Sequence, residues 1–274
     1  MIPLSYITEW RKSAPWAQSS QIEHDLVICR ALVEIFNRPL LAENLAFRGG
    51  TALFKLHMPP ARYSEDIDLV QIEAGPIGQV IDELRDSLDS WLGEPRRTRS
   101  EGRVTLIYRF TSEDNMPLRL KVEINSREHF TLHGFQRHPF AVGSRWFTGN
   151  TEILTYSLDE LLGTKLRALY QRKKGRDLFD LWYAFNRANP VPDAGRVVET
   201  FLKYMEHGGH QISRALFEQN LLEKKTDPQF TGDIEPLLTT EGGWDFDFAF
   251  GDVMGRLIAI LPGEPWQGRG AQSS

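Results

Sequence analysis

The sequence predicts an α+β N-terminal half followed by a mainly helical C-terminal half. Two stretches before residue 130 alternate apolar and polar side chains with the two-residue period of strands, whereas from Ser157 onward apolar residues recur at helical spacing. A chain of 274 residues is long enough for one large or two small domains. We therefore expect two domains, residues 1–150 and 151–274.

The N-terminal half opens with helical signals. Residues 20–23 form a capping-box pattern, so a helix is expected to begin at Ser20, and its apolar positions are Ile22, Leu26, Cys29, Val33 and Phe36. A glycine turn at 47–51 then leads into a short helix over 52–56. A second amphipathic helix is expected from about Pro76 to Leu92, because a proline stands near its start and Gly93 follows its end.

Three strands are expected among these helices. Residues 66–70 alternate polar and apolar side chains, and two longer strands follow. Their apolar faces consist of Val104, Leu106, Tyr108 and Phe110 in the first and of Leu118, Leu120, Val122 and Ile124 in the second. Residues 113–117 lie between them and are typical of a hairpin connection.

The C-terminal half is expected to be helical. A second capping box at 157–160 precedes a stripe of leucines, Gly175 interrupts the pattern, and a further helix stops at Asn189-Pro190. Additional helices are expected near 194–207, 211–224 and 250–261.

The formal charge of −5 argues against a wholly basic nucleic-acid coat protein, but the charge is unevenly distributed. Residues 96–127 hold eight basic and four acidic side chains, and residues 165–176 hold six basic and no acidic ones. Residues 227–255 hold seven acids and no lysine or arginine. We expect the basic zones to border the catalytic cleft and the acidic segment to lie away from it or to screen it.

Several classes of protein are disfavoured. No apolar stretch approaches the roughly 18 residues that span a bilayer, so we expect a cytoplasmic protein. Cys29 is the single cysteine, which excludes an internal disulfide and a cysteine-rich zinc site. No phosphate-binding P-loop and no serine-hydrolase elbow occurs, and the histidine pairs 129/133 and 207/210 lack a metal-binding context.

Asp66 and Asp68 are the strongest candidates for chemistry. Two apart on a strand, their carboxylates emerge on one face and repel each other unless a cation relieves them. Mg²⁺ prefers oxygen ligands and is commonly held by one or two carboxylates plus substrate phosphates. Glu123 would supply a third carboxylate if its strand lies beside the first. Such a cluster suits one or two Mg²⁺ ions in an in-line phosphoryl transfer.

A glycine turn precedes these carboxylates. Gly49 and Gly50 allow close approach of the backbone to a phosphate, and the helix that follows offers unsatisfied N–H groups to an anion. Arg48 could also contact phosphate, or it could pair with a nearby acid.

Together these motifs resemble the AbiEii/AbiGii-type toxins of the DNA-polymerase-β-like nucleotidyltransferase superfamily. The resemblance covers roughly residues 20 to 190. It rests on Phe47-Arg48-Gly49-Gly50-Thr51, on residues 62–69, on residues 165–169 and on residues 172–181, in the expected order. It implies a polymerase-β-like N-terminal domain, with a mixed sheet and flanking helices, and a helical C-terminal domain that completes the active-site cleft.

The resemblance also implies roles for individual residues. Gly50 and Thr51, with Gly49, match the element that holds the nucleotide triphosphate, and Asp66 and Asp68 match the metal-binding pair. Lys165 matches a lysine that acts on the nucleotide phosphates, while Asp177 and Asp180 match a stretch in which an aspartate is needed for activity. The structural alternative for Asp177 and Asp180 is pairing with Arg172 and Arg176.

The function expected from these matches is Mg²⁺-dependent transfer of a nucleotide from an NTP to an RNA such as the tRNA 3′ end. The protein would then be a toxin of a type IV toxin–antitoxin or abortive-infection system, with a cognate antitoxin encoded nearby. Two alternatives remain open: the acceptor is a small molecule or a protein, or the chain binds nucleotide or a partner without catalysis.

Overall fold

The computed structural model describes residues 2–239 and 243–268, which form two compact units, Met1–Ser157 and Leu158–Ser274. The boundary expected from the sequence, between residues 150 and 151, falls inside a strand of the first unit, β7 (Thr148–Tyr156). Glu241, one of the seven acids of the acidic segment, lies outside the described residues.

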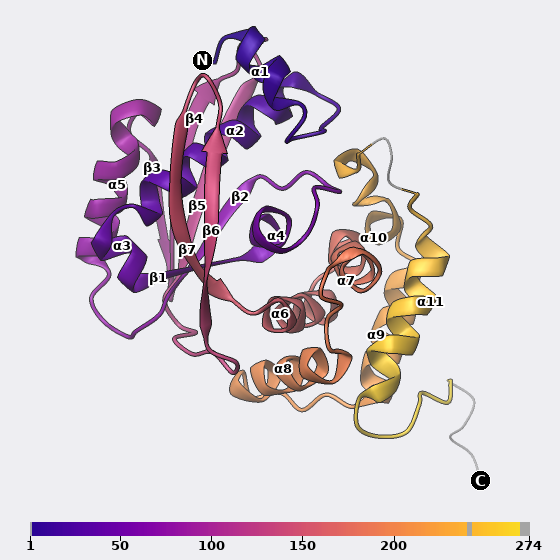
Figure 1. The fold of residues 1–274 in the computed structure, drawn as a ribbon. Coiled ribbons are helices and arrows are strands. Elements are labelled where there is room, and N and C mark those ends of the chain that lie inside the picture. Colours follow the sequence, from indigo (N-terminus) through magenta and orange to yellow (C-terminus); the bar gives the residue numbers. More distant parts are fainter. Residues whose placement is uncertain (1, 240–242, 269–274) are drawn as a thin grey trace. The chain divides into compact units, whose positions relative to one another are not determined.

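The first unit is built on a mixed seven-stranded sheet (Figure 1). Its strands are β1 (Leu45–Arg48), β2 (Asp66–Gln71), β3 (Arg96–Ser100), β4 (Arg103–Thr111), β5 (Pro117–Asn125), β6 (Phe135–Gly143) and β7, in the order β3-β4-β5-β2-β1-β7-β6. β2 is parallel to β5 and β1 is parallel to β7, while the other neighbours are antiparallel. The expected α+β class with a mixed sheet is confirmed.

Helices cover this sheet. They are α1 (Leu4–Trp10), α2 (Ser19–Phe36), α3 (Pro39–Asn44), α4 (Gly49–Ala52), which continues as a π-helical turn over Leu53–His57, and α5 (Gly78–Leu92). α2, α3 and α5 contact one another, and α2 and α5 also contact the sheet (Figure 1). The apolar faces of β4 and β5 expected from the alternation are largely buried, with Leu106, Leu120 and Val122 fully inaccessible to solvent.

The start of α2 differs from the expectation. The helix begins at Ser19, and the capping box is formed by Gln18 and Gln21 rather than by Ser20 and Glu23. Glu23 is buried and its carboxylate accepts hydrogen bonds from the backbone N–H groups of Ile2 (3.1 Å) and Glu113 (2.8 Å). The predicted cap was wrong because the Glu23 carboxylate binds backbone groups from distant parts of the chain. The local sequence does not reveal these partners.

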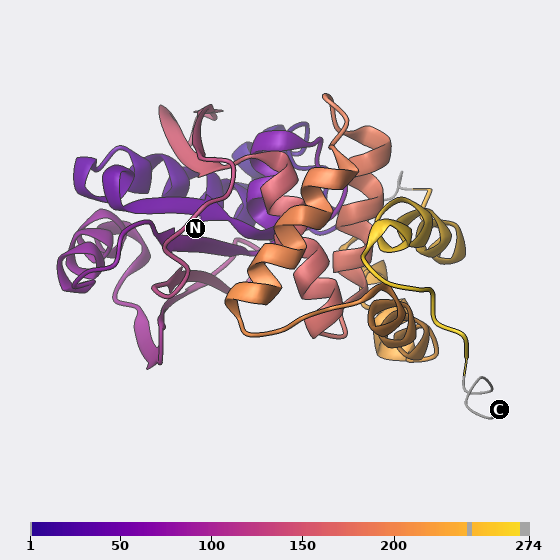
Figure 2. The ribbon, with the colours of Figure 1, turned by 90° about the horizontal axis from the view of Figure 1, so that it is seen from below.

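The second unit is helical. Its helices are α6 (Leu158–Gln171), α7 (Gly175–Arg187), α8 (Ala194–His207), α9 (Arg214–Lys225), α10 (Pro228–Gly232) and α11 (Phe246–Arg256), with 3₁₀ turns at Glu235–Leu237 and Ile258–Ile260. α6 and α8 pack side by side (Figures 1 and 2). The buried Lys224 of α9 donates to the carbonyl oxygens of Leu169 (2.5 Å) and Tyr170 (2.6 Å), so its charge satisfies the C-terminal end of α6.

No helix within the described ranges combines the length and the apolar character that crossing a membrane requires.

Buried histidines make the first unit sensitive to acid. His24 is 1% exposed and its Nδ1 is hydrogen-bonded to the Tyr63 hydroxyl. Burial lowers the pKa of His24 from 6.5 to about 4, so below pH 6.5 the unfolded chain takes up a proton that the folded chain resists. Stability is therefore full above pH 6.5 and falls as the pH drops toward 4, by up to ~3 kcal/mol for this residue.

Urea unfolding at pH 7.5, 6.5, 5.5 and 4.5 measures this effect. His24→Asn should lower stability at pH 7.5 but flatten the dependence on pH. His57, whose pKa burial also lowers to about 4, should keep part of the slope. An unchanged slope in His24→Asn would contradict the assignment.

Candidate active site

Three carboxylates meet on neighbouring strands of the first unit. Asp66 and Asp68 lie half-buried on one face of β2, while Ile67 and Leu69 are buried on the other. β5 runs parallel beside β2, and Glu123 stands at the register position of Asp68. The strand of Glu123 thus lies beside that of Asp66 and Asp68, which is the condition that its role as a third carboxylate requires.

A lysine that the sequence analysis missed lies among these carboxylates. Lys121 is the register partner of Asp66, and its Nζ lies 3.8 Å from Asp66 Oδ2 and 2.8 Å from Glu123 Oε2. Arg103 also contacts Glu123, at 3.0 Å. Lys121 shares the strand face of Glu123 two residues away, which is the signal that could have identified it.

The electrostatics of the cluster favour a cation. Burial raises the pKa of Asp66 to about 6, Lys121 lowers it, and the neighbouring charges of Asp68, Glu65 and Glu123 raise it further. The ionised form of Asp66 is therefore held at a free-energy cost near neutral pH, and a bound cation would relieve that cost.

Two of the three carboxylates suit Mg²⁺. Asp66 and Asp68 offer oxygen ligands on one face, and a Mg²⁺ ion commonly needs only one or two carboxylates when substrate phosphates and water supply the rest. Within residues 2–239 and 243–268, no group of three His, Cys, Asp or Glu side chains is arranged to hold a metal ion. Glu123 is instead engaged with Lys121 and Arg103, and those ion pairs must open before it could act as a third ligand.

The glycine turn packs directly against this cluster. Gly49 adopts φ +84°, and a Cβ at that position would lie 2.2 Å from Asp68 Oδ2. A Cβ on Gly50 would lie 2.4 Å from an Arg62 guanidinium nitrogen and 3.1 Å from Ser64 Oγ. Gly49 therefore requires glycine, because of its positive φ and its close approach to Asp68, whereas a side chain at Gly50 would displace the end of the Arg62 side chain.

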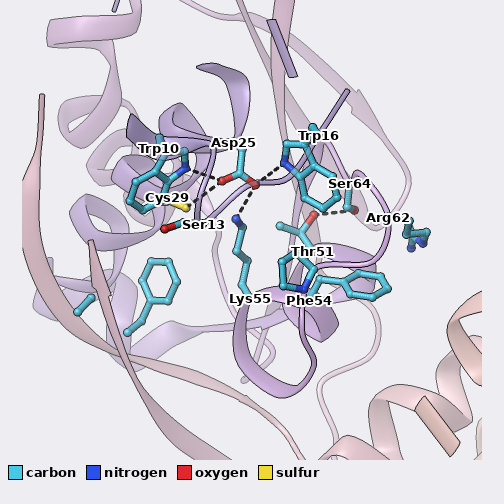
Figure 3. A pocket seen from close by; sticks show the side chains of 13 residues that line it. Trp10, Ser13, Trp16, Asp25, Cys29, Thr51, Phe54, Lys55, Arg62 and Ser64 are labelled. Carbon is cyan, nitrogen blue, oxygen red and sulfur yellow. Dashed lines mark hydrogen bonds and ion pairs between the residues drawn. The ribbon is translucent and has the colours of Figure 1, made fainter. Parts of the chain in front are cut away.

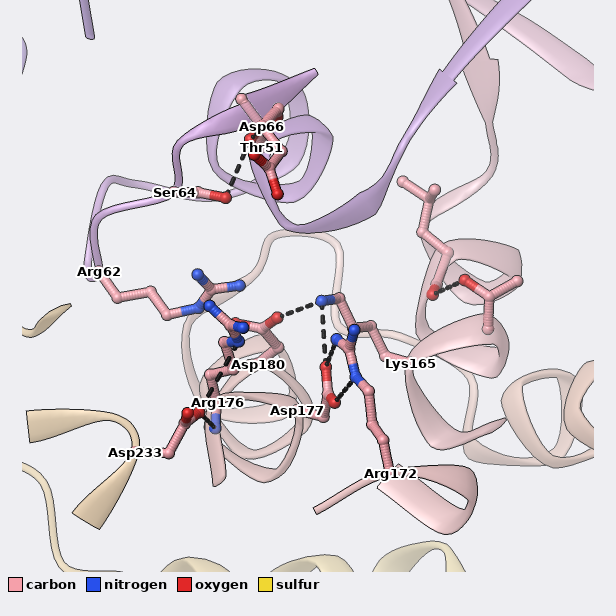
Figure 4. Close-up of polar contacts among 12 residues, drawn as sticks. Thr51, Arg62, Ser64, Asp66, Lys165, Arg172, Arg176, Asp177, Asp180 and Asp233 are labelled. Carbon is pink, nitrogen blue, oxygen red and sulfur yellow. Dashed lines mark hydrogen bonds and ion pairs between the residues drawn. The ribbon is translucent and has the colours of Figure 1, made fainter. Parts of the chain in front are cut away.

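Thr51 and Arg48 are both occupied by contacts within the unit. Thr51 is 1% exposed, and its hydroxyl donates to the carbonyl oxygen of Asp66 at 2.6 Å and is hydrogen-bonded to Ser64 at 2.9 Å (Figure 4). Arg48 donates to Glu128 at 2.7 Å and is the register partner of Asp68. The Thr51 side chain thus fixes the start of β2. Arg48 pairs with an acid, which is the alternative to phosphate contact that the sequence left open.

A cavity of about 210 Å³ adjoins the same turn (Figure 3). Its polar centre is a buried ion pair, in which Lys55 Nζ lies 2.6 Å from Asp25 Oδ2. The indole N–H groups of Trp10 and Trp16 donate to the two oxygens of Asp25 at 2.9 and 3.1 Å. Because the Asp25 carboxylate is fully engaged, we interpret the pair as part of the support for the turn.

The second unit brings together three predicted residues. Lys165 on α6 lies with its Nζ 2.9 Å from Asp180 Oδ2 and 3.3 Å from Asp177 Oδ1, both on α7 (Figure 4). Both aspartates are fully buried, and Lys165 is 7% exposed. Arg172 binds Asp177 through two nitrogens, at 2.6 and 2.7 Å. The pairing of Asp177 with Arg172, which is the structural alternative to a catalytic role, is therefore present.

The acidic segment neutralises part of the second basic zone. Lys173 pairs with Asp227 at 3.2 Å, and Lys174 and Arg176 pair with Asp233 at 3.2 and 3.7 Å. Arg176 therefore pairs with an acid of the segment 227–255. These three cations are less available to an external polyanion than the sequence alone indicates.

Comparisons with known proteins agree with this architecture. The family model described as "Nucleotidyl transferase AbiEii toxin, Type IV TA system" matches residues 30–252. The nucleotidyltransferase toxin MenT4 of Mycobacterium tuberculosis superposes with a TM-score of 0.70 at 18% identity, over 96% of this chain and 91% of that one. JHP933 of Helicobacter pylori superposes with a TM-score of 0.55 at 15% identity, over 88% and 92%. No curated protein sequence matches the chain at a significant level.

Proposed function

Because the chain belongs to the AbiEii family of nucleotidyltransferase toxins of type IV toxin–antitoxin systems, we propose that it transfers a nucleotide from an NTP to an RNA acceptor such as the tRNA 3′ end. The observation that carries this proposal is the cluster of Asp66 and Asp68 packed against the Gly49–Gly50 turn. This cluster places carboxylates that suit Mg²⁺ next to a backbone turn that can approach a phosphate closely.

In this proposal Asp66 and Asp68 hold one or two Mg²⁺ ions, and Glu123 is a candidate third ligand. The metal, when bound, stabilises charge on the transferring phosphate. The turn of Gly49 and Gly50, with the backbone of Thr51, holds the triphosphate, because small residues and unsatisfied N–H groups admit an anion there.

Further cations complete the proposed site. Lys121 stands beside Asp66 and can turn from Glu123 toward a phosphate oxygen. In the second unit, Lys165 keeps the role that the family resemblance implies, action on the nucleotide phosphates, and Asp177 and Asp180 hold its ammonium in place. Arg48 forms an ion pair with Glu128, and this pairing holds its positive charge close to the Asp68 carboxylate.

The excess of basic residues within 96–127 supports RNA as acceptor, since phosphate backbones bind clusters of lysine and arginine. As a type IV system toxin, the protein has a cognate antitoxin. We propose that the antitoxin is encoded next to it and that both act in the cytoplasm.

A labelling assay tests the proposal. Purified protein is incubated with each α-³²P-labelled NTP, Mg²⁺ and total tRNA, and the products are separated on a denaturing gel. Label is expected on tRNA with at least one NTP, and chelation of Mg²⁺ should abolish it. Absence of label with every NTP, or label on protein or a small molecule instead of RNA, would contradict an RNA acceptor.

A further inference from the structure

One face of the outer strands carries a row of arginines beside the catalytic carboxylates. Register partners point to the same side of a sheet, and residues two apart on a strand share a face. The face of Asp66 and Asp68 therefore continues through Lys121 and Glu123 on β5. It also carries four arginines: Arg119 on β5, Arg103 and Arg109 on β4, and Arg96 on β3.

Three of these arginines lack an acidic partner. Arg103 pairs with Glu123, but Arg96, Arg109 and Arg119 are exposed, and among the described residues no carboxylate lies within ion-pair distance of them. Arg109 and Arg119 are direct cross-strand partners. Like charges placed opposite each other destabilise an antiparallel pair, so this arrangement costs stability in the isolated protein.

A cavity lies at this arginine pair. It measures about 430 Å³ and lies around the ends of β4 and β5, where Thr111 and Pro117 line it. Arg109 and Arg119 line it from the carboxylate face, Phe110 and Leu118 from the opposite face, and Tyr63, Glu65 and the buried His24 complete it. Two guanidinium groups against one carboxylate leave the lining net positive. Guanidinium groups bind phosphate through two nitrogens, and apolar or aromatic walls accept a base or sugar. The lining therefore suits a nucleotide unit of a nucleic-acid strand.

The position of the arginine pair fits an acceptor strand. Arg119 stands two residues from Lys121, about 7 Å along β5, and Lys121 is the register partner of Asp66. Tyr63 and Glu65 immediately precede Asp66 in the chain. A strand whose phosphate is held by Arg109 and Arg119 thus lies on the face of the sheet that carries the carboxylates.

We propose that Arg109 and Arg119 bind a backbone phosphate of the acceptor RNA and that Arg96 extends this contact toward the β3 edge. This inference rests on the proposed function, and it assigns the RNA to one face of the sheet. Arg97 and Arg99 provide a matched control, because they alternate to the opposite face, where their register partners Leu106 and Val104 are buried.

The test compares two double variants that each remove two positive charges, R109Q/R119Q and R97Q/R99Q. Binding of end-labelled total tRNA is measured from 50 to 300 mM salt. Transfer kinetics are measured with the NTP identified by the labelling assay, and Mg²⁺-NTP binding is measured by calorimetry.

R109Q/R119Q should weaken tRNA binding at least tenfold and raise the KM for tRNA. Its kcat and its affinity for the NTP should stay within about twofold of wild type. Its slope of log K against log salt should fall by about 0.7, since the two arginines share one phosphate and each phosphate contact to a single strand contributes ~0.7.

R97Q/R99Q should stay within about twofold of wild type in every measurement. Equal losses in both variants, or no loss in R109Q/R119Q, would overturn the assignment. Wild-type protein that does not bind tRNA, or that prefers DNA of the same length, would overturn it as well. The same measurements distinguish failure of this inference from failure of the proposed function. If tRNA binding depends on Arg109 and Arg119 but no nucleotide is transferred, the RNA-binding face is supported and the proposed transfer reaction is contradicted.

Discussion

Asp66→Asn and Asp68→Asn should each reduce nucleotide transfer by about a thousandfold or more while the protein stays folded. In the proposed function these carboxylates hold Mg²⁺, so the loss of either removes several kcal/mol of stabilisation of the transferring phosphate, and each 1.36 kcal/mol corresponds to a factor of ten in rate. The matched control is Glu73→Gln, which neutralises an exposed carboxylate just beyond β2 and should keep full activity.

The stability of Asp66→Asn should move in the opposite direction to its activity. Because burial and neighbouring carboxylates raise the pKa of Asp66 to about 6, its ionised form destabilises the fold above that pH. The asparagine variant should therefore melt at the same or a higher temperature than wild type at pH 7.5. Mg²⁺ should raise the Tm of the wild type but not that of the variant.

Differential scanning fluorimetry with and without 5–10 mM Mg²⁺, on the order of typical assay concentrations, measures both effects beside the activity assay. A variant that retains its activity would exclude Asp66 from the metal site. A variant that melts well below wild type would show that the carboxylate is needed for folding, and loss of activity would then say nothing about metal binding.

The sequence predicted the central strands well because their burial follows a period of two. β4, β5 and the hairpin between them were expected with nearly the observed bounds, whereas the pairing of β5 with β2, which places Glu123 beside Asp68, was left open. β3 was missed because all five of its residues are exposed, so no apolar alternation marks it. The hairpin of β6 and β7 was missed because Thr148–Thr151 and most of β6 are polar or exposed.

The candidate site was predictable as a set of residues but not as a set of interactions. The sequence pointed to Thr51 and Lys165 as ligands for phosphate, whereas the structure shows a Thr51 hydroxyl bound to Asp66 and a Lys165 ammonium bound to two aspartates. Lys121 was overlooked although it shares the strand face of Glu123, because its contact with Asp66 depends on the register between β2 and β5. Partners of charged side chains depend on register between distant segments, which local patterns do not encode.

Lys165→Met should destabilise the second unit by about 3–5 kcal/mol. The change leaves Asp180 fully buried without the ammonium that lies 2.9 Å away, and breaking a buried ion pair by removing one partner typically has this cost. Asp177 keeps Arg172, which binds both of its oxygens. Urea unfolding followed by tryptophan fluorescence, with Trp182 on α7 as a reporter, measures the loss.

The double variant Lys165→Met/Asp180→Leu separates stability from catalysis. Replacing both partners of a buried pair by apolar side chains is often neutral, so the double variant should regain most of the stability lost in Lys165→Met. If the cluster also acts on the nucleotide, transfer should stay at the background level despite the restored fold. A double variant that regains both stability and activity would assign Lys165 and Asp180 a structural role alone, and the phosphates would then depend on cations of the first unit such as Lys121.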